Sequence, residues 1–405
     1  MRKFLIKIII RLIVLVLIFS LASYIHVGMN KAEAQTEDII RVGLPVPETG
    51  GASRWGTFCL RGALLAEQQI NNTGGVLGKK IKIIKSDSQG IPDEAVSAAQ
   101  RMIHRDKVHL FIAAMNSSET KALQPIVEEA KIPMVAAASS DPEITYRAGV
   151  GGFKWTFRNY PTEEIRTLVL LEYTIKEKGF SKFSMLAVDN DFGRSAVTFT
   201  QKYLPRFPNA RFASFNFFSL KEVDFRPVLS KIKAAGSEVI CLYTNTTETM
   251  QVMGRQMREL GLAGKVRIMG LGDITHPENI KALQEVLEGA IEVTLWQLQW
   301  DHPRSRQFVE DYNKMFSEAP NVLAYSYWET THLVAQAIKN AKSLKNEDIY
   351  KALKAIKYES VMGTIYFDDH NQSNMPMVLL EVVNGKPVIK GTFWSRPDYP
   401  TKTKQ

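Results

Sequence analysis

Short apolar stretches alternate with longer segments of helically spaced apolar residues from residue 39 to about residue 290. Short apolar runs bounded by turn residues predict buried strands, and i, i+3, i+4 spacing predicts helices. The first expected strands are 39–45, 80–86, 109–113 and 133–136. The helices expected with them are 56–73, 92–104 and 119–130. Such alternation is typical of a parallel sheet with helices on both faces.

The alternation begins again after about Phe157, which predicts a second unit of the same kind. Its expected strands are 183–188, 212–218, 239–243 and 266–270. Its expected helices are 162–178, 191 onward, 226–235, 247–260 and 277–287. After residue 294 the pattern changes to helices at 303–316, 325–340 and 348–356, followed by short strands and turns. The sequence therefore predicts an α/β protein of two doubly wound lobes.

The first residues follow a different pattern. A basic start (Arg2, Lys3, Lys7, Arg11) precedes an apolar run at 12–22, and Ala32-Glu33-Ala34 offers a small-x-small cleavage site. This order predicts a signal peptide, residues 1–34, cleaved after Ala34. An uncleaved membrane anchor is the alternative, although the uninterrupted apolar core is shorter than the ~20 residues of a spanning helix. We therefore expect an exported protein in the periplasm.

Charge and cysteine content exclude some classes of protein. The chain has 405 residues and a formal charge of +9, but residues 1–34 carry five basic side chains and one acidic, which leaves +5 for the rest. The basic residues form no dense stripe, so a nucleic-acid partner is not expected. Cys59 and Cys241 fall in different expected lobes. Since a disulfide between them would lock the lobes together, we expect two buried free thiols.

The usual short motifs of catalysis and cofactor binding are absent from the sequence. There is no Gly-x-Gly-x-x-Gly after the first strand, no P-loop, no Cys-x-x-Cys or His-x-x-x-His pair and no Gly-x-Ser-x-Gly elbow. Each of these patterns marks a specific chemistry. We therefore expect no cofactor, no metal and no enzymatic activity.

Hydroxyl-bearing loops follow two neighbouring expected strands. Asn116-Ser117-Ser118 comes after strand 109–113, and Ala138-Ser139-Ser140-Asp141-Pro142 comes after strand 133–136. Ligands of open α/β sheets bind at the carboxyl ends of strands, and the N-termini of the following helices favour anions. Ser and Asp are also the commonest N-cap residues, so one such loop alone would be unremarkable. Two adjacent loops indicate a site for a carboxylate.

At these residues the chain resembles the type I periplasmic binding proteins, in particular the branched-chain amino acid (leucine/isoleucine/valine) binding family. The resemblance covers nearly all of residues 38–395. The order and spacing of its landmarks are more specific than any single one of them. The landmarks are Ile40-Arg41-Val42-Gly43, Gly50-Gly51-Ala52-Ser53-Arg54-Trp55-Gly56, Arg61-Gly62-Ala63, Gly78-Lys79-Lys80-Ile81, Ser117-Ser118, the 133–142 segment, Asp189-Asn190-Asp191-Phe192-Gly193 and Gly363-Thr364-Ile365-Tyr366-Phe367-Asp368.

The resemblance implies two lobes that are joined by three hinge strands and close on a ligand. Lobe 1 would comprise residues 38–157 and 294–364, and lobe 2 residues 158–293 and 365–405. By motif alignment, the ligand's α-carboxylate would meet Ser117, Ala138 and Ser140 of the first lobe, and Trp55 would pack over the ligand.

The second lobe departs from the family pattern. Phe192 stands where the family often has tyrosine, and Asn245-Thr246-Thr247 stands where it often has an aromatic residue. Asp273 supplies the acid expected opposite the ligand's ammonium group, and it could equally cap a turn. Asn159 and Tyr160 follow the predicted first crossing between lobes and are further candidates for the cleft.

The predicted function is that of a substrate-binding protein of an ABC importer, a monomer that binds a small amino acid or related carboxylate and presents its closed form to a membrane permease. One alternative is an extracellular sensor of the same fold. Another is an exported enzyme such as an amidohydrolase, for which the sequence shows no nucleophile, base or metal site. Aromatic carboxylates, small amides and urea are alternative ligands.

Overall fold

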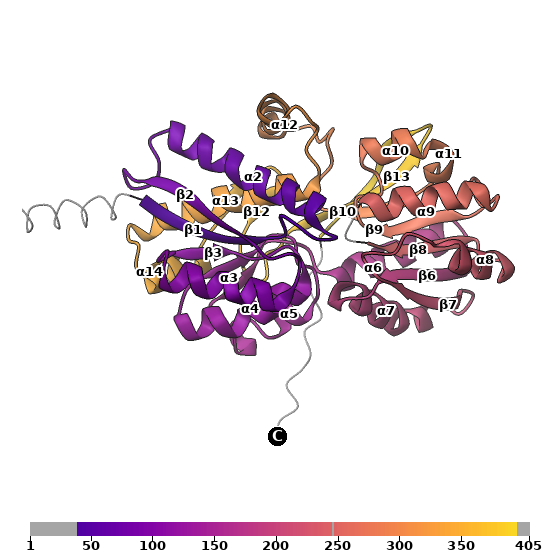
Figure 1. Cartoon of the computed structure of the whole chain (residues 1–405), viewed down its shortest axis with the longest axis horizontal. Coiled ribbons are helices and arrows are strands. Elements are labelled where there is room, and N and C mark those ends of the chain that lie inside the picture. The colour runs from indigo at the N-terminus through magenta and orange to yellow at the C-terminus, as the bar shows by residue number, and fades with distance from the viewer. Residues whose placement is uncertain (1–38, 245–246, 395–405) are drawn as a thin grey trace, which may run out of the picture.

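The structure is a computed structural model that describes residues 39–244 and 247–394, and it consists of two α/β lobes side by side along the long axis of the molecule (Figure 1). The signal-peptide prediction for residues 1–34 lies outside the described residues. None of the described helices is long and apolar enough to cross a bilayer.

The first lobe is built on a five-stranded parallel sheet in the order β2-β1-β3-β4-β5. Its strands are β1 (Ile39–Val46), β2 (Lys80–Asp87), β3 (Leu110–Ile112), β4 (Met134–Ala136) and β5 (Thr156–Arg158). Alternate residues of β1 and the helices α2 (Ser53–Asn72) and α13 (Val322–Ala341) form one core, and α3 (Pro92–His104) and α4 (Ser117–Ala130) contribute to a second core. The sheet is therefore covered by helices on both faces.

The second lobe repeats this plan in a seven-stranded sheet, β14-β13-β10-β9-β8-β6-β7. Its parallel strands are β6 (Lys182–Val188), β7 (Arg211–Phe218), β8 (Val239–Tyr243), β9 (Arg267–Leu271) and β10 (Ile291–Thr294). Two antiparallel strands, β13 (Pro376–Val383) and β14 (Lys386–Trp394), extend the sheet beyond β10. The helices are α6 (Glu163–Glu172), α7 (Asp191–Tyr203), α8 (Arg226–Ala234), α9 (Thr247–Glu259), α10 (Pro277–Ala282) and α11 (Gln284–Leu287).

The parallel strands of both lobes follow the same order, in which the first strand of each lobe lies between its second and third strands. This doubly wound arrangement brings the carboxyl ends of the strands, and the loops after them, to one edge of each sheet. Those edges face each other across the middle of the molecule in Figure 1. The fold thus places the two sets of strand-end loops on opposite sides of a single cleft.

The chain passes between the lobes three times. It leaves the first sheet after β5, and it leaves the second sheet after β10 to form α12 (Pro303–Phe316), α13 and α14 (Asn346–Lys354). The small hairpin of β11 (Tyr358–Ser360) and β12 (Gly363–Ile365) precedes the last passage, into β13. Helix α13 packs closely on α2, since a Cβ at Gly62 would lie 2.0 Å from the carbonyl oxygen of Ala324. The late segment thus completes the core of the first lobe.

Several expected elements differ from the structure. Strands β5 and β10 were not expected, because β5 has three residues and β10 carries the charged Glu292 in its centre. The helix expected at 277–287 is divided at Leu283, and the helix expected at 162–178 ends in a π-helical turn, Tyr173–Glu177. The tail begins with the short strand β12, as expected, but continues in the longer strands β13 and β14, which extend the edge of the second sheet. Cys59 and Cys241 are buried free thiols.

Candidate functional site

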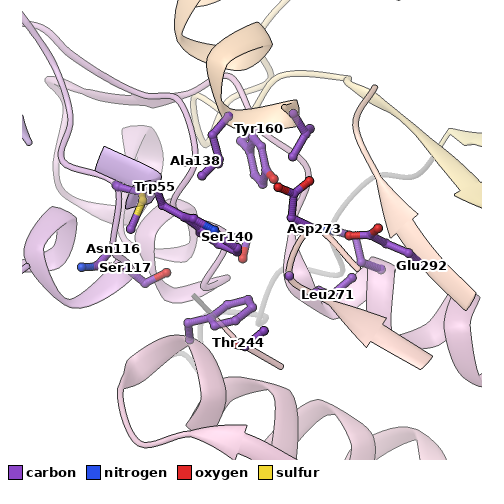
Figure 2. A pocket seen from close by; sticks show the side chains of 16 residues that line it. Trp55, Asn116, Ser117, Ala138, Ser140, Tyr160, Thr244, Leu271, Asp273 and Glu292 are labelled. Carbon is purple, nitrogen blue, oxygen red and sulfur yellow. The ribbon is translucent and has the colours of Figure 1, made fainter. Parts of the chain in front are cut away.

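A pocket of about 500 Å³ lies in the cleft, and loops of both lobes form its walls (Figure 2). Its first-lobe walls come from the start of α2, the loops after β3 and β4, and the start of α13. Its second-lobe walls come from α6, α7 and the ends of β8, β9 and β10. Its lining residues are Trp55, Met115, Asn116, Ser117, Ala138, Ser140, Tyr160, Arg166, Phe192, Thr244, Leu271, Gly272, Asp273, Glu292, Val322 and Leu323.

The two serine loops of the first lobe are tied to each other. The Ser139 hydroxyl lies 2.6 Å from the Thr120 hydroxyl of α4 and 3.0 Å from the carbonyl oxygen of Ala114. The Ser117 hydroxyl accepts a hydrogen bond from the backbone N–H of Asp141 at 3.2 Å. These contacts hold the start of α4 beside the loop after β4.

This corner of the pocket can hold an anion. Ser117 is the first residue of α4, a helix of 14 residues, whose first backbone N–H groups have no intrahelical acceptor. Because the Ser117 oxygen accepts its bond from Asp141, its own hydrogen is available to a ligand. Ser140 and Ala138 lie across from it at the same end of the pocket (Figure 2). Helix N-termini and hydroxyl donors together favour a carboxylate.

The opposite end of the pocket is acidic. Asp273 follows β9 in a left-handed conformation (φ 60°), and its Oδ2 accepts a hydrogen bond from the Asn321 side chain at 2.9 Å. Gly272 precedes it with φ 141°, where a Cβ would lie 2.6 Å from Cγ2 of Thr244. Only glycine therefore lets the chain turn this close to β8 and direct Asp273 into the pocket.

Glu292 is the second acid at this end. It is 2% exposed, and its Oε2 accepts hydrogen bonds from the backbone N–H of Thr275 at 2.9 Å and from the Thr275 hydroxyl at 2.7 Å. Burial, together with the neighbouring charge of Asp273, raises the pKa of Glu292. A cationic group placed between the two carboxylates would relieve both effects.

Arg166 is the one charged base on the pocket wall among the described residues. Its Nε and Nη2 both donate to the carbonyl oxygen of Val293, at 3.1 and 2.8 Å, and its guanidinium lies 5.5 Å from the centre of the Tyr160 ring. These contacts fix the arginine against β10. This end of the pocket thus has two carboxylates and one guanidinium, so acidic groups outnumber basic ones.

Apolar and aromatic side chains form the remaining walls. Trp55, Tyr160 and Phe192 approach from α2, the first crossing and α7, and Phe192 also packs against Tyr243 at 5.9 Å between ring centres. Leu271 closes the second-lobe side. Apolar walls with polar groups at both ends are the usual make-up of a small-molecule site.

Most of the residues predicted from the sequence meet at this pocket: Trp55, Ser117, Ala138, Ser140, Tyr160, Phe192 and Asp273. Asn159 does not line it, because its side chain turns into the first lobe and donates to the Thr330 hydroxyl at 3.1 Å. Thr246 lies outside the described residues.

Three residues of the pocket wall were not predicted from the sequence: Arg166, Thr244 and Glu292. Arg166 lies inside an amphipathic helix, where a charged residue carries no special signal. Glu292 lies on a strand that was not expected. Thr244 could have been found from the sequence, because it directly follows β8 and so lies at the carboxyl end of a parallel strand.

The lobes touch at the rim of the pocket. Lys121 of α4 lies 3.1 Å from Asp141 in its own lobe and 3.3 Å from Asp191 at the start of α7. Burial alone would lower the pKa of Lys121, but the two carboxylates outweigh it and the pKa is raised. On another part of the rim, Arg54 of α2 lies 3.6 Å from Glu278 of α10. The two lobes therefore contact each other on two parts of the rim.

Across residues 39–244 and 247–394, no cluster of His, Cys, Asp and Glu side chains could hold a metal ion. Two doubly wound lobes that meet around one pocket are the architecture of hinge-closing ligand-binding proteins. The periplasmic binding protein family matches residues 39–387, and the chain belongs to that family.

Curated relatives span most of the chain. A leucine-, isoleucine-, valine-, threonine- and alanine-binding protein from Pseudomonas aeruginosa is 24% identical over 332 residues, which is 82% of this chain and 86% of the relative. A leucine-specific-binding protein from Salmonella typhimurium is 23% identical over 348 residues, 85% of this chain and 90% of the relative.

Solved structures confirm the fold. A solute-binding protein of an ABC transporter from Rhodopseudomonas palustris, in complex with 3,4-dihydroxybenzoic acid, gives a TM-score of 0.80 at 24% identity and covers 89% of this chain and 99% of its own. A leucine-binding protein from Thermotoga maritima gives a TM-score of 0.77 at 23% identity, with coverage of 87% and 98%.

Proposed function

We propose that this protein is the extracytoplasmic substrate-binding protein of an ABC importer and that it binds an α-amino acid between its lobes. The observation that carries the proposal is the polarity of the pocket. An anion site at Ser117 and Ser140 lies at one end, and the carboxylates of Asp273 and Glu292 lie at the other. An amino acid presents the complementary pair of charges.

The mechanism is hinge closure. The ligand's carboxylate binds the first lobe and its ammonium group binds the second, so both contacts exist only when the cleft is closed. Binding therefore shifts the population to the closed form. The moving units would be residues 38–157 with 294–364 and residues 158–293 with 365–405, and a membrane permease would recognise the closed monomer in the periplasm.

The relatives support this assignment, since one is named for binding leucine, isoleucine, valine, threonine and alanine and another is named as leucine-specific. A second ligand class is aromatic carboxylates, because Trp55, Tyr160 and Phe192 line the pocket and a solute-binding protein of similar fold holds 3,4-dihydroxybenzoic acid. The two acids favour the amino acid, because an aromatic acid without an amino group leaves the Arg166 guanidinium as the one cation facing two carboxylates on the described pocket wall.

A ligand screen by thermal unfolding tests the proposal. The purified protein is unfolded and refolded to remove bound ligand, then melted with amino acids, aromatic acids and small amides. A ligand at ~1,000 times its dissociation constant adds about 4 kcal/mol of stability, a shift of several degrees. We expect such a shift with amino acids. A shift with aromatic acids alone would overturn the amino-acid assignment, and no shift with any carboxylate would overturn the pocket's proposed polarity.

A further inference from the structure

A fully buried arginine lies behind the carboxylate end of the pocket. Arg158 is the last residue of β5, has no exposed surface and is not part of the pocket wall. Burying a guanidinium is costly unless its N–H groups find hydrogen-bond acceptors. The acceptors that this arginine uses therefore indicate what its burial achieves.

The guanidinium donates to four neutral oxygen atoms. Its Nη1 donates to the carbonyl oxygens of Asp141 at 2.6 Å and of Ser139 at 3.4 Å. Its Nη2 donates to the Thr145 hydroxyl at 2.6 Å, and its Nε donates to the side-chain oxygen of Gln372 at 2.6 Å. One side chain thus joins the loop after β4 to α5 (Glu143–Tyr146) and to the segment that leads into β13.

Gln372 fixes the guanidinium from the side of the crossings between the lobes. Its amide nitrogen donates to the carbonyl oxygens of Tyr160 and Ser373, both at 2.9 Å. The backbone of Arg158 also bonds this segment, donating to Asn371 and accepting from Ser373, both at 2.9 Å. The first and third crossings therefore run side by side and set the position of the arginine relative to the loop.

The peptide between Ser140 and Asp141 is held at both ends. The Ser140 carbonyl oxygen accepts the backbone N–H of Glu163 at 2.9 Å, and the Asp141 N–H donates to the Ser117 hydroxyl at 3.2 Å. Neither Glu163 nor the buried guanidinium lines the pocket. All three carbonyl groups of residues 139–141 are thus directed at groups outside the pocket wall.

Ser140 keeps its own donors for the pocket. It is 3% exposed and lines the pocket, and no acceptor in residues 39–244 or 247–394 takes a hydrogen bond from its N–H or its hydroxyl. The C=O and N–H of a trans peptide point in opposite directions. The bond from Arg158 to the Ser139 carbonyl therefore directs the Ser140 N–H away from the guanidinium.

We propose that Arg158 is a positioning residue of the carboxylate site. It holds the carbonyl oxygens of the loop away from the pocket, so that the Ser140 N–H and hydroxyl face the ligand's carboxylate. A loop carbonyl that turned toward the pocket would instead repel that carboxylate. This inference rests on the proposed function and names the residue that builds the anion-binding end of its site.

Isothermal titration calorimetry of the ligand-stripped protein tests the proposal with two probes. The first is whichever of the twenty standard amino acids binds the native protein most tightly, and the second is the amine that lacks its carboxylate (isopentylamine for leucine). A positioning role at the carboxylate site affects the first probe alone. A general loss of structure affects both probes.

Arg158→Lys is the main variant, because lysine keeps the positive charge but not the planar fork that joins the loop to Gln372. It should weaken amino-acid binding about tenfold, the effect of one lost hydrogen bond to a charged group, and leave amine binding within about twofold. Arg304→Lys is the matched control. Arg304 donates to the carbonyl oxygen of Glu359 at 2.8 Å, away from the pocket wall, so its variant should leave both affinities within about twofold.

Thr145→Val is a second, milder variant that removes the acceptor of Nη2 and leaves the arginine in place. It should weaken amino-acid binding about threefold and amine binding not at all, and it decides the question if Arg158→Lys does not fold. Thermal unfolding of each variant without ligand shows which of them fold.

The outcomes separate this inference from the proposed function. Native amino-acid affinity in Arg158→Lys overturns the positioning role and leaves the amino-acid assignment standing, and so does native affinity in Thr145→Val if Arg158→Lys is unfolded. An equal loss for the amino acid and the amine would show a structural role for the arginine and also overturns the proposal. If none of the twenty amino acids binds the native protein, the proposed function fails and this inference fails with it.

Discussion

The ion pair between Lys121 and Asp191 joins the lobes. Removing it should weaken ligand binding, although neither side chain lines the pocket. The two side chains are 25% and 38% exposed and lie 3.3 Å apart. A pair this exposed contributes about 1 kcal/mol. Because hinge opening would separate the two side chains, Asp191→Asn should disfavour closure by that amount and weaken the apparent affinity about fivefold.

Asp191 is the better partner to change. Lys121→Met would also remove the ion pair to Asp141, which is buried beside the serine loop. Asp191 lies in the first turn of α7, so its replacement also loses a favourable interaction with the helix dipole. That loss is the same in the open and closed forms, and it therefore lowers stability without changing ligand affinity.

The measurement is the dissociation constant of the best amino acid from the thermal screen, by calorimetry, for a set of variants. Asp189→Asn is the matched control, because Asp189 pairs with Arg194 of its own lobe at 2.9 Å. It should leave affinity unchanged. In a Lys121→Met background, Asp191→Asn should have no further effect. Equal effects of the two aspartate variants, or a full effect of Asp191→Asn in that background, would refute the reasoning.

Further predictions concern the carboxylate site, a strained turn and a buried acid. Ser117→Ala should weaken amino-acid binding tenfold to a hundredfold, since hydrogen bonds to charged groups contribute about 1.5–3 kcal/mol. Ser118 lies outside the pocket, so Ser118→Ala should leave the affinity unchanged. Equal affinities of the two variants would contradict a carboxylate site at Ser117. Gly272→Ala should lower the free energy of unfolding by about 2 kcal/mol in denaturant titrations, because the added Cβ meets Thr244 in a left-handed turn; unchanged stability would contradict that geometry. Burial raises the pKa of Glu119 from 4.5 to about 7, so its contribution to stability is present below about pH 4.5 and is lost as the pH rises through 7. The free energy of unfolding of Glu119→Gln, relative to the native chain, should therefore rise by up to about 3 kcal/mol between pH 4 and pH 8. Glu129 is exposed on the same helix, and Glu129→Gln should show no such rise. Parallel pH profiles of stability for Glu119→Gln and the native chain would refute the raised pKa.

The sequence predicted the architecture well because strand and helix periods are local properties. The alternation up to residue 290 indicated two parallel sheets, and the serine loops were found because carboxyl ends of strands are marked in the sequence. The resemblance to binding proteins then added Trp55, Phe192 and Asp273, which line the pocket.

The residues that were missed depend on tertiary contacts. Glu292 and Arg166 become site residues only because β10 and α6 pass the end of the pocket, and their spacing in sequence carries no sign of this. Asn159 was misplaced for a related reason. Asn159 and Tyr160 are adjacent, and successive side chains of an extended segment point to opposite sides, so one faces the cleft and the other turns into the lobe.

The most direct test of the central claim is a comparison of one amino acid with two analogues that each lack one charge. The protein is titrated with the amino acid that gives the largest thermal shift, with the same compound lacking its amino group and with the same compound lacking its carboxylate. We predict at least hundredfold weaker binding for both analogues, because each leaves one end of the pocket without its partner. Full affinity for the analogue without the amino group would contradict the roles assigned to Asp273 and Glu292, and full affinity for the analogue without the carboxylate would contradict those of Ser117 and Ser140.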